Sequence, residues 1–152
     1  VAFTLTTTDD ALAAQIEPGA PLPSRRLQAM SALAAAGICT GTAMMPVLPF
    51  IEDNEANITA IVERTREAGG RFVFPWFGMS LRDRQRAYYY RELDRLFPGL
   101  RQKYEERYGE RYSCPVPNAR ALERLFHALC ARHGIASRMG PLQPTPSQLP
   151  LF

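Results

Sequence analysis

The sequence predicts an α/β fold built on parallel strands, and two observations lead to this prediction. Short apolar segments, at residues 1–6, 38–48 and 72–74, alternate with longer segments whose apolar residues recur at helical spacing. The order strand–helix–strand–helix–strand with short links is typical of parallel strands joined by right-handed crossovers. We therefore expect these strands to lie side by side in one sheet.

In the first strand, apolar residues alternate with small ones, and Thr8 or Asp9 is expected to cap a short helix. The loop EPGAPLP, residues 17–23, follows, and its prolines exclude a helix there. Ser24 is expected to cap the next helix, and Gly37 is placed to end it.

The second strand, residues 38–48, contains two residues with special backbone properties. Gly41 allows another group to approach closely, and Pro46 interrupts the hydrogen-bond ladder near the strand's end. Asp53 or Asn54 is expected to cap the helix that follows.

The stretch RFVFPWFGMSLRDRQR, residues 71–86, contains the third strand and the start of a charged helix. Pro75 cannot donate to a ladder, so it is expected to end the strand. Trp76, Phe77 and Met79 then lie at the carboxyl end of a parallel strand, where ligands bind in α/β folds. They either line a substrate cavity or pack the following helices onto the sheet.

The pattern turns helical after residue 80, with segments at 81–97 and 100–108, a turn at 113–117, and a last helix from Asn118 to about residue 133. We therefore predict a strand-containing part (1–79), a helical C-terminal extension (80–139) and a Pro-rich tail (140–152) that is extended and poorly ordered. In the extension, the arginines from Arg82 to Arg111 alternate with acidic residues. Those of the first helical segment, Arg82, Arg84, Arg86, Arg91 and Arg95, are expected to point away from its apolar face. Such alternation is typical of a solvated, salt-bridged surface, and contact with nucleic acid is the alternative.

Size and composition are those of one globular domain. The chain has 152 residues, 46% of them hydrophobic and 22% charged, with a net charge of +3. It contains neither a signal-peptide pattern nor a membrane-length apolar run, so we expect a cytoplasmic protein with reduced cysteines. Because Val1 begins directly inside a strand, we expect the chain to be the C-terminal part of a longer protein.

Four blocks, EPGAPLPSRRL, PVLPFIEDNEANI, FPWFGMSLRDRQRAYYY and RYSCPVPNA, resemble the radical S-adenosylmethionine (radical SAM) superfamily. The likeness is to the branch described as spore photoproduct lyase-like or DNA repair photolyase-like. It implies the C-terminal part of a partial (β/α)6 barrel, followed here by the helical extension. It also implies an enzyme in which a [4Fe–4S] cluster cleaves S-adenosylmethionine to a 5′-deoxyadenosyl radical.

The cluster-binding CxxxCxxC motif of that family does not occur in this sequence. Cys39, Cys114 and Cys130 are too far apart to replace a loop that offers three thiolates to one cluster. His127 and His133 lack the helical spacing of a joint metal site. The resemblance therefore implies that the cluster ligands belong to a preceding part of the protein and that this portion alone is inactive. We assign no catalytic residue.

The resemblance also suggests where S-adenosylmethionine is held. Thr4 and Thr6 share one face of the first strand and offer hydroxyls to the ribose; small polar residues tolerated at a strand end are the alternative. Arg26, or its neighbour Arg25, is expected to hold the cofactor carboxylate, with Glu17 fixing the loop or the arginine. The alternative is a structural ion pair or two solvated charges.

PVLPFIED stands where the family has a GxIxGxxE-like pattern, with Pro49 in place of the usual Gly and Glu52 at the acidic position. Met44, Pro46 and Val47 would then form an apolar wall and a backbone edge for the adenine, or else belong to the core. The family's name does not identify a substrate.

The chain ends in Gln148, Leu149, Pro150, Leu151 and Phe152 after a Pro-rich spacer. This end is similar to the QLxLF motif with which bacterial replication and repair proteins bind the DNA sliding clamp. Two large apolar anchors on a flexible tether suit such a pocket. The alternative function is therefore a non-catalytic appendage that binds nucleic acid or the clamp, and a tail packed on its own domain is the simpler possibility.

Overall fold

The computed structural model describes residues 1–140, except for the side chain of Asp83. Strands and helices alternate as expected, so the prediction of an α/β fold with parallel strands is confirmed; the described residues do not form a closed barrel. The elements are β1 (Ala2–Thr4), α1 (Asp10–Ile16), α2 (Pro23–Ala35), β2 (Gly41–Met44), α3 (Glu55–Glu67), β3 (Phe72–Pro75), β4 (Gly78–Ser80), α4 (Asp83–Leu96), α5 (Leu100–Tyr108), β5 (Ser113–Pro115) and α6 (Ala119–His133).

The main sheet has the order β1-β2-β3, and both of its strand pairs are parallel. Beyond β3, Ala136 forms a single parallel bridge to Phe72. Strands β1 and β2 are both shorter than predicted. The pairing of β2 stops at Met44, before Pro46, which has no N–H to donate.

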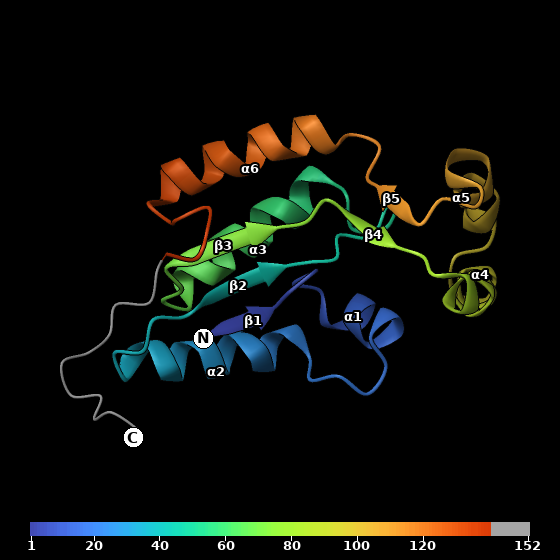
Figure 1. Cartoon of the computed structure of the whole chain (residues 1–152). Helices are drawn as coiled ribbons and strands as arrows, with labels where there is room; N and C mark the ends of the chain where they lie inside the picture. Colours follow the sequence, from blue (N-terminus) through green and yellow to red (C-terminus); the bar gives the residue numbers. More distant parts are fainter. Residues whose placement is uncertain (141–152) are drawn as a thin grey trace, which may run out of the picture.

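One face of this sheet carries the main core. The register places Phe3, Thr42 and Val73 side by side on that face. Helices α2, α3 and α6 supply the rest of the core (Figure 1). Its buried members are Leu5, Leu27, Met30, Met44, Val47, Ile58, Ile61, Val62, Val73, Val116, Leu122, Phe126, Leu129, Cys130 and Ile135.

The opposite face carries Ala2, Gly41 and Phe72 in one row, and no described helix covers it (Figure 1). Phe72 stacks on Phe74 with ring centroids 6.1 Å apart. The ring of Phe72 also lies over Gly41, where an added Cβ would come within 2.6 Å of the ring and 2.3 Å of the Phe72 carbonyl oxygen. The close approach predicted at Gly41 is therefore made by the neighbouring strand.

A second unit is inserted between β3 and α6. It consists of β4 and β5, which pair antiparallel, together with α4 and α5 (Figure 1). It has its own core, here called the second core: Met79, Leu81, Tyr90, Leu93, Tyr104, Tyr108 and Cys114. Helix α6, which lies within the range 80–139 predicted as a helical extension, packs against α3 in the main core.

Three local predictions are wrong. Ser24 does not cap α2, which begins with Pro23; instead the Ser24 hydroxyl and N–H both donate to the carboxylate of Asp10. The segment at 113–117 is not only a turn, since it contains β5. Arg86 does not point to solvent but is 8% exposed in the second unit.

The caps expected near Asp9 and Asn54 are confirmed: each side chain accepts backbone N–H groups of the helix that follows it.

No helix within residues 1–140 combines the length and the apolar character needed to cross a membrane.

Candidate functional site

The carboxyl ends of β1, β2 and β3 meet at one edge of the main sheet, because the strands are parallel. The exits of β2 and β3 are joined there, since the Trp76 N–H donates to the Met44 carbonyl and the Val47 N–H donates to the Trp76 carbonyl. We call the segment from β2 to α3, residues 45–54, the edge loop. This edge is the place at which the sequence predicted ligand binding.

Thr4 and Thr6 differ in accessibility at this edge. Thr4 ends β1 and is exposed on the uncovered face, whereas Thr6 follows the strand and is 5% exposed. The carbonyl of Thr6 accepts a 2.8 Å hydrogen bond from the Asn57 side chain. Only Thr4 therefore presents a hydroxyl that a ligand can reach without rearrangement.

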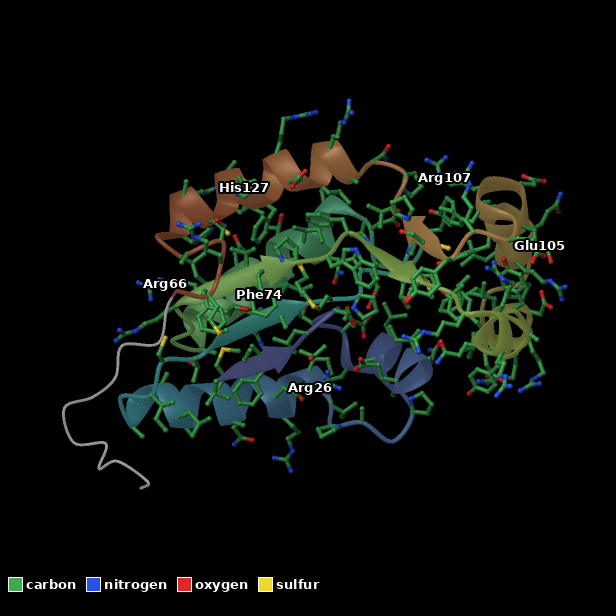
Figure 2. The ribbon with its side chains drawn as sticks, viewed as in Figure 1. Arg26, Arg66, Phe74, Glu105, Arg107 and His127 are labelled. Carbon is green, nitrogen blue, oxygen red and sulfur yellow. The ribbon has the colours of Figure 1, made fainter. Side chains whose placement is uncertain are left out.

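Glu17 and Arg26 form a partly buried ion pair, with 2.6 Å between the Arg26 Nη2 and Glu17 Oε2 atoms. Arg26 also donates from Nη1 to the Thr4 carbonyl and from Nε to the Pro21 carbonyl, at 2.8 and 2.7 Å. Arg25 is exposed, and its guanidinium donates to the Gln28 side chain. Of the two arginines, Arg26 is thus the one at the edge, and it ties the proline loop to β1 (Figure 2).

We expect Arg26→Ala to lower the free energy of unfolding by about 2 kcal/mol, because the Thr4 and Pro21 carbonyls and Glu17 all lose a charged donor. Urea denaturation followed by fluorescence measures this loss. Arg25→Ala is the matched control and should change stability by less than about 0.5 kcal/mol. Equal effects of the two substitutions would contradict the role of Arg26 as a tie.

Met44 and Val47 are fully buried members of the main core. Their side chains pack against the helices, so only their main chain can face a ligand at the edge. Pro46 is exposed, and the Met45–Pro46 peptide bond is cis. Of the apolar wall expected from these residues, Pro46 is the one accessible side chain.

Glu52 is a fully buried carboxyl group at the end of the edge loop. Its Oε2 accepts the Leu48 N–H at 2.9 Å, and its Oε1 has no hydrogen-bond partner among the residues that the structure describes. Burial raises its pKa to about 7; the Thr6 side chain and the Leu48 N–H oppose the rise, and the charges of Glu17 and Asp53 add to it. A carboxyl group that titrates near neutrality is a common feature of functional sites.

The sequence contained a signal for this burial. Glu52 follows an almost uninterrupted apolar run, residues 44–51, and an acid in that setting has few ways to remain solvated.

The three side chains predicted at the end of β3 lie in different environments: those of Trp76, Phe77 and Met79. Phe77 packs on the main core with its ring edge toward Phe126, and Met79 is buried in the second core. Trp76 is 44% exposed at the carboxyl end of β3. Two of these side chains therefore hold the inserted unit, and one is available at the edge.

The charges of α4 and α5 are largely paired with one another. Glu92 bonds Arg95 at 2.8 Å, and Arg101 bridges Asp94 and Glu105 at 3.1 and 2.8 Å. All of these except Glu92 have well-exposed side chains, which is the solvated, salt-bridged surface expected from the alternating charges.

Within residues 1–140, no group of three or more His, Cys, Asp or Glu side chains is arranged to hold a metal ion. Cys39 is exposed just before β2, at the opposite edge of the sheet, whereas Cys114 and Cys130 are buried in different cores. The described residues therefore do not fit a [4Fe–4S] cluster.

The chain is similar to uncharacterized proteins of Mycobacterium bovis and of two strains of Mycobacterium tuberculosis, each 29% identical over 144 residues. The match covers 95% of this chain but 42% of each relative, so the chain spans less than half of their length. No protein-family profile matches the chain, and no solved structure matches it significantly.

Proposed function

We propose that this chain is the C-terminal portion of a radical SAM enzyme of the photolyase-like branch. One observation carries the proposal: the first three blocks of the resemblance, far apart in sequence, meet at the carboxyl edge of the main sheet, and the fourth pairs with the segment that follows β3. Arg26 of the first block donates to Thr4 at the end of β1, and Val47 of the second block donates to Trp76 of the third. The fourth block forms β5, which pairs with β4 directly after the third strand.

In that family, a [4Fe–4S] cluster and S-adenosylmethionine together supply a radical that abstracts hydrogen from the substrate. The described residues hold no ligand set for the cluster, so its ligands would belong to another part of the protein. The described residues fit S-adenosylmethionine better than they fit the cluster. The edge offers the Thr4 hydroxyl, the exposed Pro46, and an arginine held in place by Glu17.

In this proposal, Arg26 acts on the cofactor with the N–H groups that its other bonds leave free. A guanidinium has five N–H groups, and the bonds to Glu17, Thr4 and Pro21 use three of them. Thr6, Met44 and Val47 contribute packing, because their side chains are buried and the Thr6 carbonyl, the Met44 carbonyl and the Val47 N–H already bond Asn57 and Trp76.

The test uses the longer polypeptide that contains this chain. A CxxxCxxC motif upstream is the first expectation. The protein, purified without oxygen, reconstituted with iron and sulfide and reduced with dithionite, should then form 5′-deoxyadenosine from S-adenosylmethionine, measured by chromatography. A protein that carries a reducible cluster but forms no 5′-deoxyadenosine would overturn the proposal. A Thr4→Val variant of the same protein should bind S-adenosylmethionine more weakly and contain the same amount of iron.

A second candidate function rests on the C-terminal sequence QLPLF, which lies outside the described residues. We propose that Leu151 and Phe152 anchor the chain to the DNA sliding clamp, with Leu149 beside them and Gln148 fixing the register. A pull-down with purified clamp should retain the wild-type chain and lose the Leu151→Ala/Phe152→Ala variant. Binding that survives both substitutions would exclude this site, and cofactor chemistry would be unaffected by either result.

A further inference from the structure

The edge loop lies between the two cores. Val47 belongs to the main core, whereas Leu48, Phe50 and Ile51 pack against the second core. The loop is therefore the segment through which the inserted unit of α4, α5, β4 and β5 contacts the carboxyl edge of the main sheet.

Tyr104 of α5 makes the most direct contact with this loop. Its hydroxyl group is buried and donates to the Pro49 carbonyl at 2.7 Å. The Tyr89 hydroxyl of α4 in turn donates to the Tyr104 hydroxyl at 2.9 Å. Burial is the largest cause of a raised pKa at both phenols, so both remain neutral donors at physiological pH. A chain of two hydrogen bonds thus runs from the inserted unit to the edge loop.

The backbone at Phe50, next to Pro49, has a conformation that requires support from its surroundings. Phe50 has a φ of 64°, a left-handed conformation that is costly for a bulky side chain. The Phe50 ring lies edge-on to Tyr104, with centroids 5.5 Å apart, and 6.3 Å from the ring of Tyr108. Strained residues of this kind persist only where the surroundings hold them, and they concentrate at functional sites.

Further hydrogen bonds fix the C-terminal part of the edge loop. The Leu48 N–H bonds Glu52, and the Asn57 side chain donates both to the Glu52 carbonyl and to the Thr6 carbonyl after β1. A shift at Pro49 would therefore move the groups that form the carboxyl edge.

We propose that Tyr104 is a positioning residue for the ligand site at this edge, acting through Pro49 on the edge loop. The inserted unit is then the element that sets the shape of the site, and not a separate appendage. The identity of the ligand as S-adenosylmethionine rests on the proposed function, whereas the positioning of the loop does not.

The experiment compares Tyr104→Phe with Tyr108→Phe in the longer protein that contains this chain. Both variants keep the aromatic ring, and both lose one hydroxyl bond to a carbonyl, but Tyr108 bonds Pro115 of β5 and not the edge loop. Amide hydrogen exchange reports on residues 45–54, and calorimetry gives the dissociation constant of S-adenosylmethionine. Tyr89→Phe is a second variant, since it removes the outer bond of the chain and leaves the Pro49 bond in place.

For Tyr104→Phe we expect exchange in the edge loop to rise about tenfold and the dissociation constant to rise about fivefold. Tyr89→Phe should give a smaller change in the same direction, and Tyr108→Phe should leave the loop within about twofold of wild type. Equal loop exchange in the Tyr104 and Tyr108 variants, or no change in either, would overturn the inference. If wild type itself does not bind S-adenosylmethionine, the proposed function fails, and the exchange measurement still decides the role of Tyr104.

Discussion

Arg86→Met is expected to lower the free energy of unfolding of the inserted unit by about 3 kcal/mol. Arg86 is 8% exposed on α4 and donates to the carbonyls of Gly109, Glu110 and Arg111 at 2.7 to 3.0 Å. These carbonyls belong to the segment between α5 and β5, so one guanidinium joins α4 to this segment of the inserted unit. Charged hydrogen bonds of this kind contribute more than neutral ones, and methionine replaces none of them.

Urea denaturation followed by the fluorescence of Trp76, the one tryptophan in the chain, measures this loss near the junction of the two units. Arg84→Met is the matched control, because Arg84 lies two residues earlier on the same helix and is exposed. It should change stability by less than about 0.5 kcal/mol. Arg86→Lys should recover part of the loss, since an ammonium reaches some of the same carbonyls. A result in which both methionine variants are equally stable would show that the carbonyl contacts contribute little.

The position of Arg86 also shows what the sequence can reveal about α4. Tyr90, Leu93 and Phe97 follow Arg86 at intervals of four, seven and eleven residues, which is the spacing of one helix face. The periodicity therefore contained the signal for an inward arginine. It was outweighed by the general rule that arginines point to solvent, which fails where a cluster of backbone carbonyls provides partners.

The strand and helix order could be predicted because each element has a local cause. Apolar runs, the Asp9 and Asn54 caps and the prolines all act within a few residues. The contact between Ser24 and Asp10 could not be predicted in this way, since it joins two helices across fourteen residues. Likewise, the spacing of apolar residues in α6 predicts a helix but does not reveal that it covers α3.

The location of the candidate site could be predicted from topology, because parallel strands bring their carboxyl ends together. The topology did not reveal which side chains are exposed at this edge. Thr4 and Thr6 share a face only while the strand continues, and β1 ends at Thr4. The burial of Glu52 depends on the conformation of the edge loop, in which the Leu48 N–H bonds the Glu52 carboxylate, and the sequence does not reveal that conformation.

Glu52→Gln is expected to remove a pH dependence of stability from the chain. The pKa of Glu52 is raised by burial from the ordinary value of 4.5 to about 7 in the folded protein. Between these two values, the unfolded chain has released the proton while the folded chain still holds it. Stability therefore falls as the pH rises through this window, by about 3 kcal/mol in total, and is constant above and below it.

Glutamine has the shape of the protonated acid and can still accept the Leu48 N–H through its amide oxygen. The free energies of unfolding of the two proteins should thus be similar near pH 4.5 and should diverge as the pH rises, with the variant more stable by about 3 kcal/mol near pH 8. Urea denaturation at steps of pH from 4.5 to 8 measures the difference. Asp53 and all other titrating groups are common to both proteins, so the slope of the difference isolates Glu52. A difference that stays constant over this range would show that Glu52 is ionised in the folded chain, and the buried carboxyl group would then need a partner that the described residues do not provide.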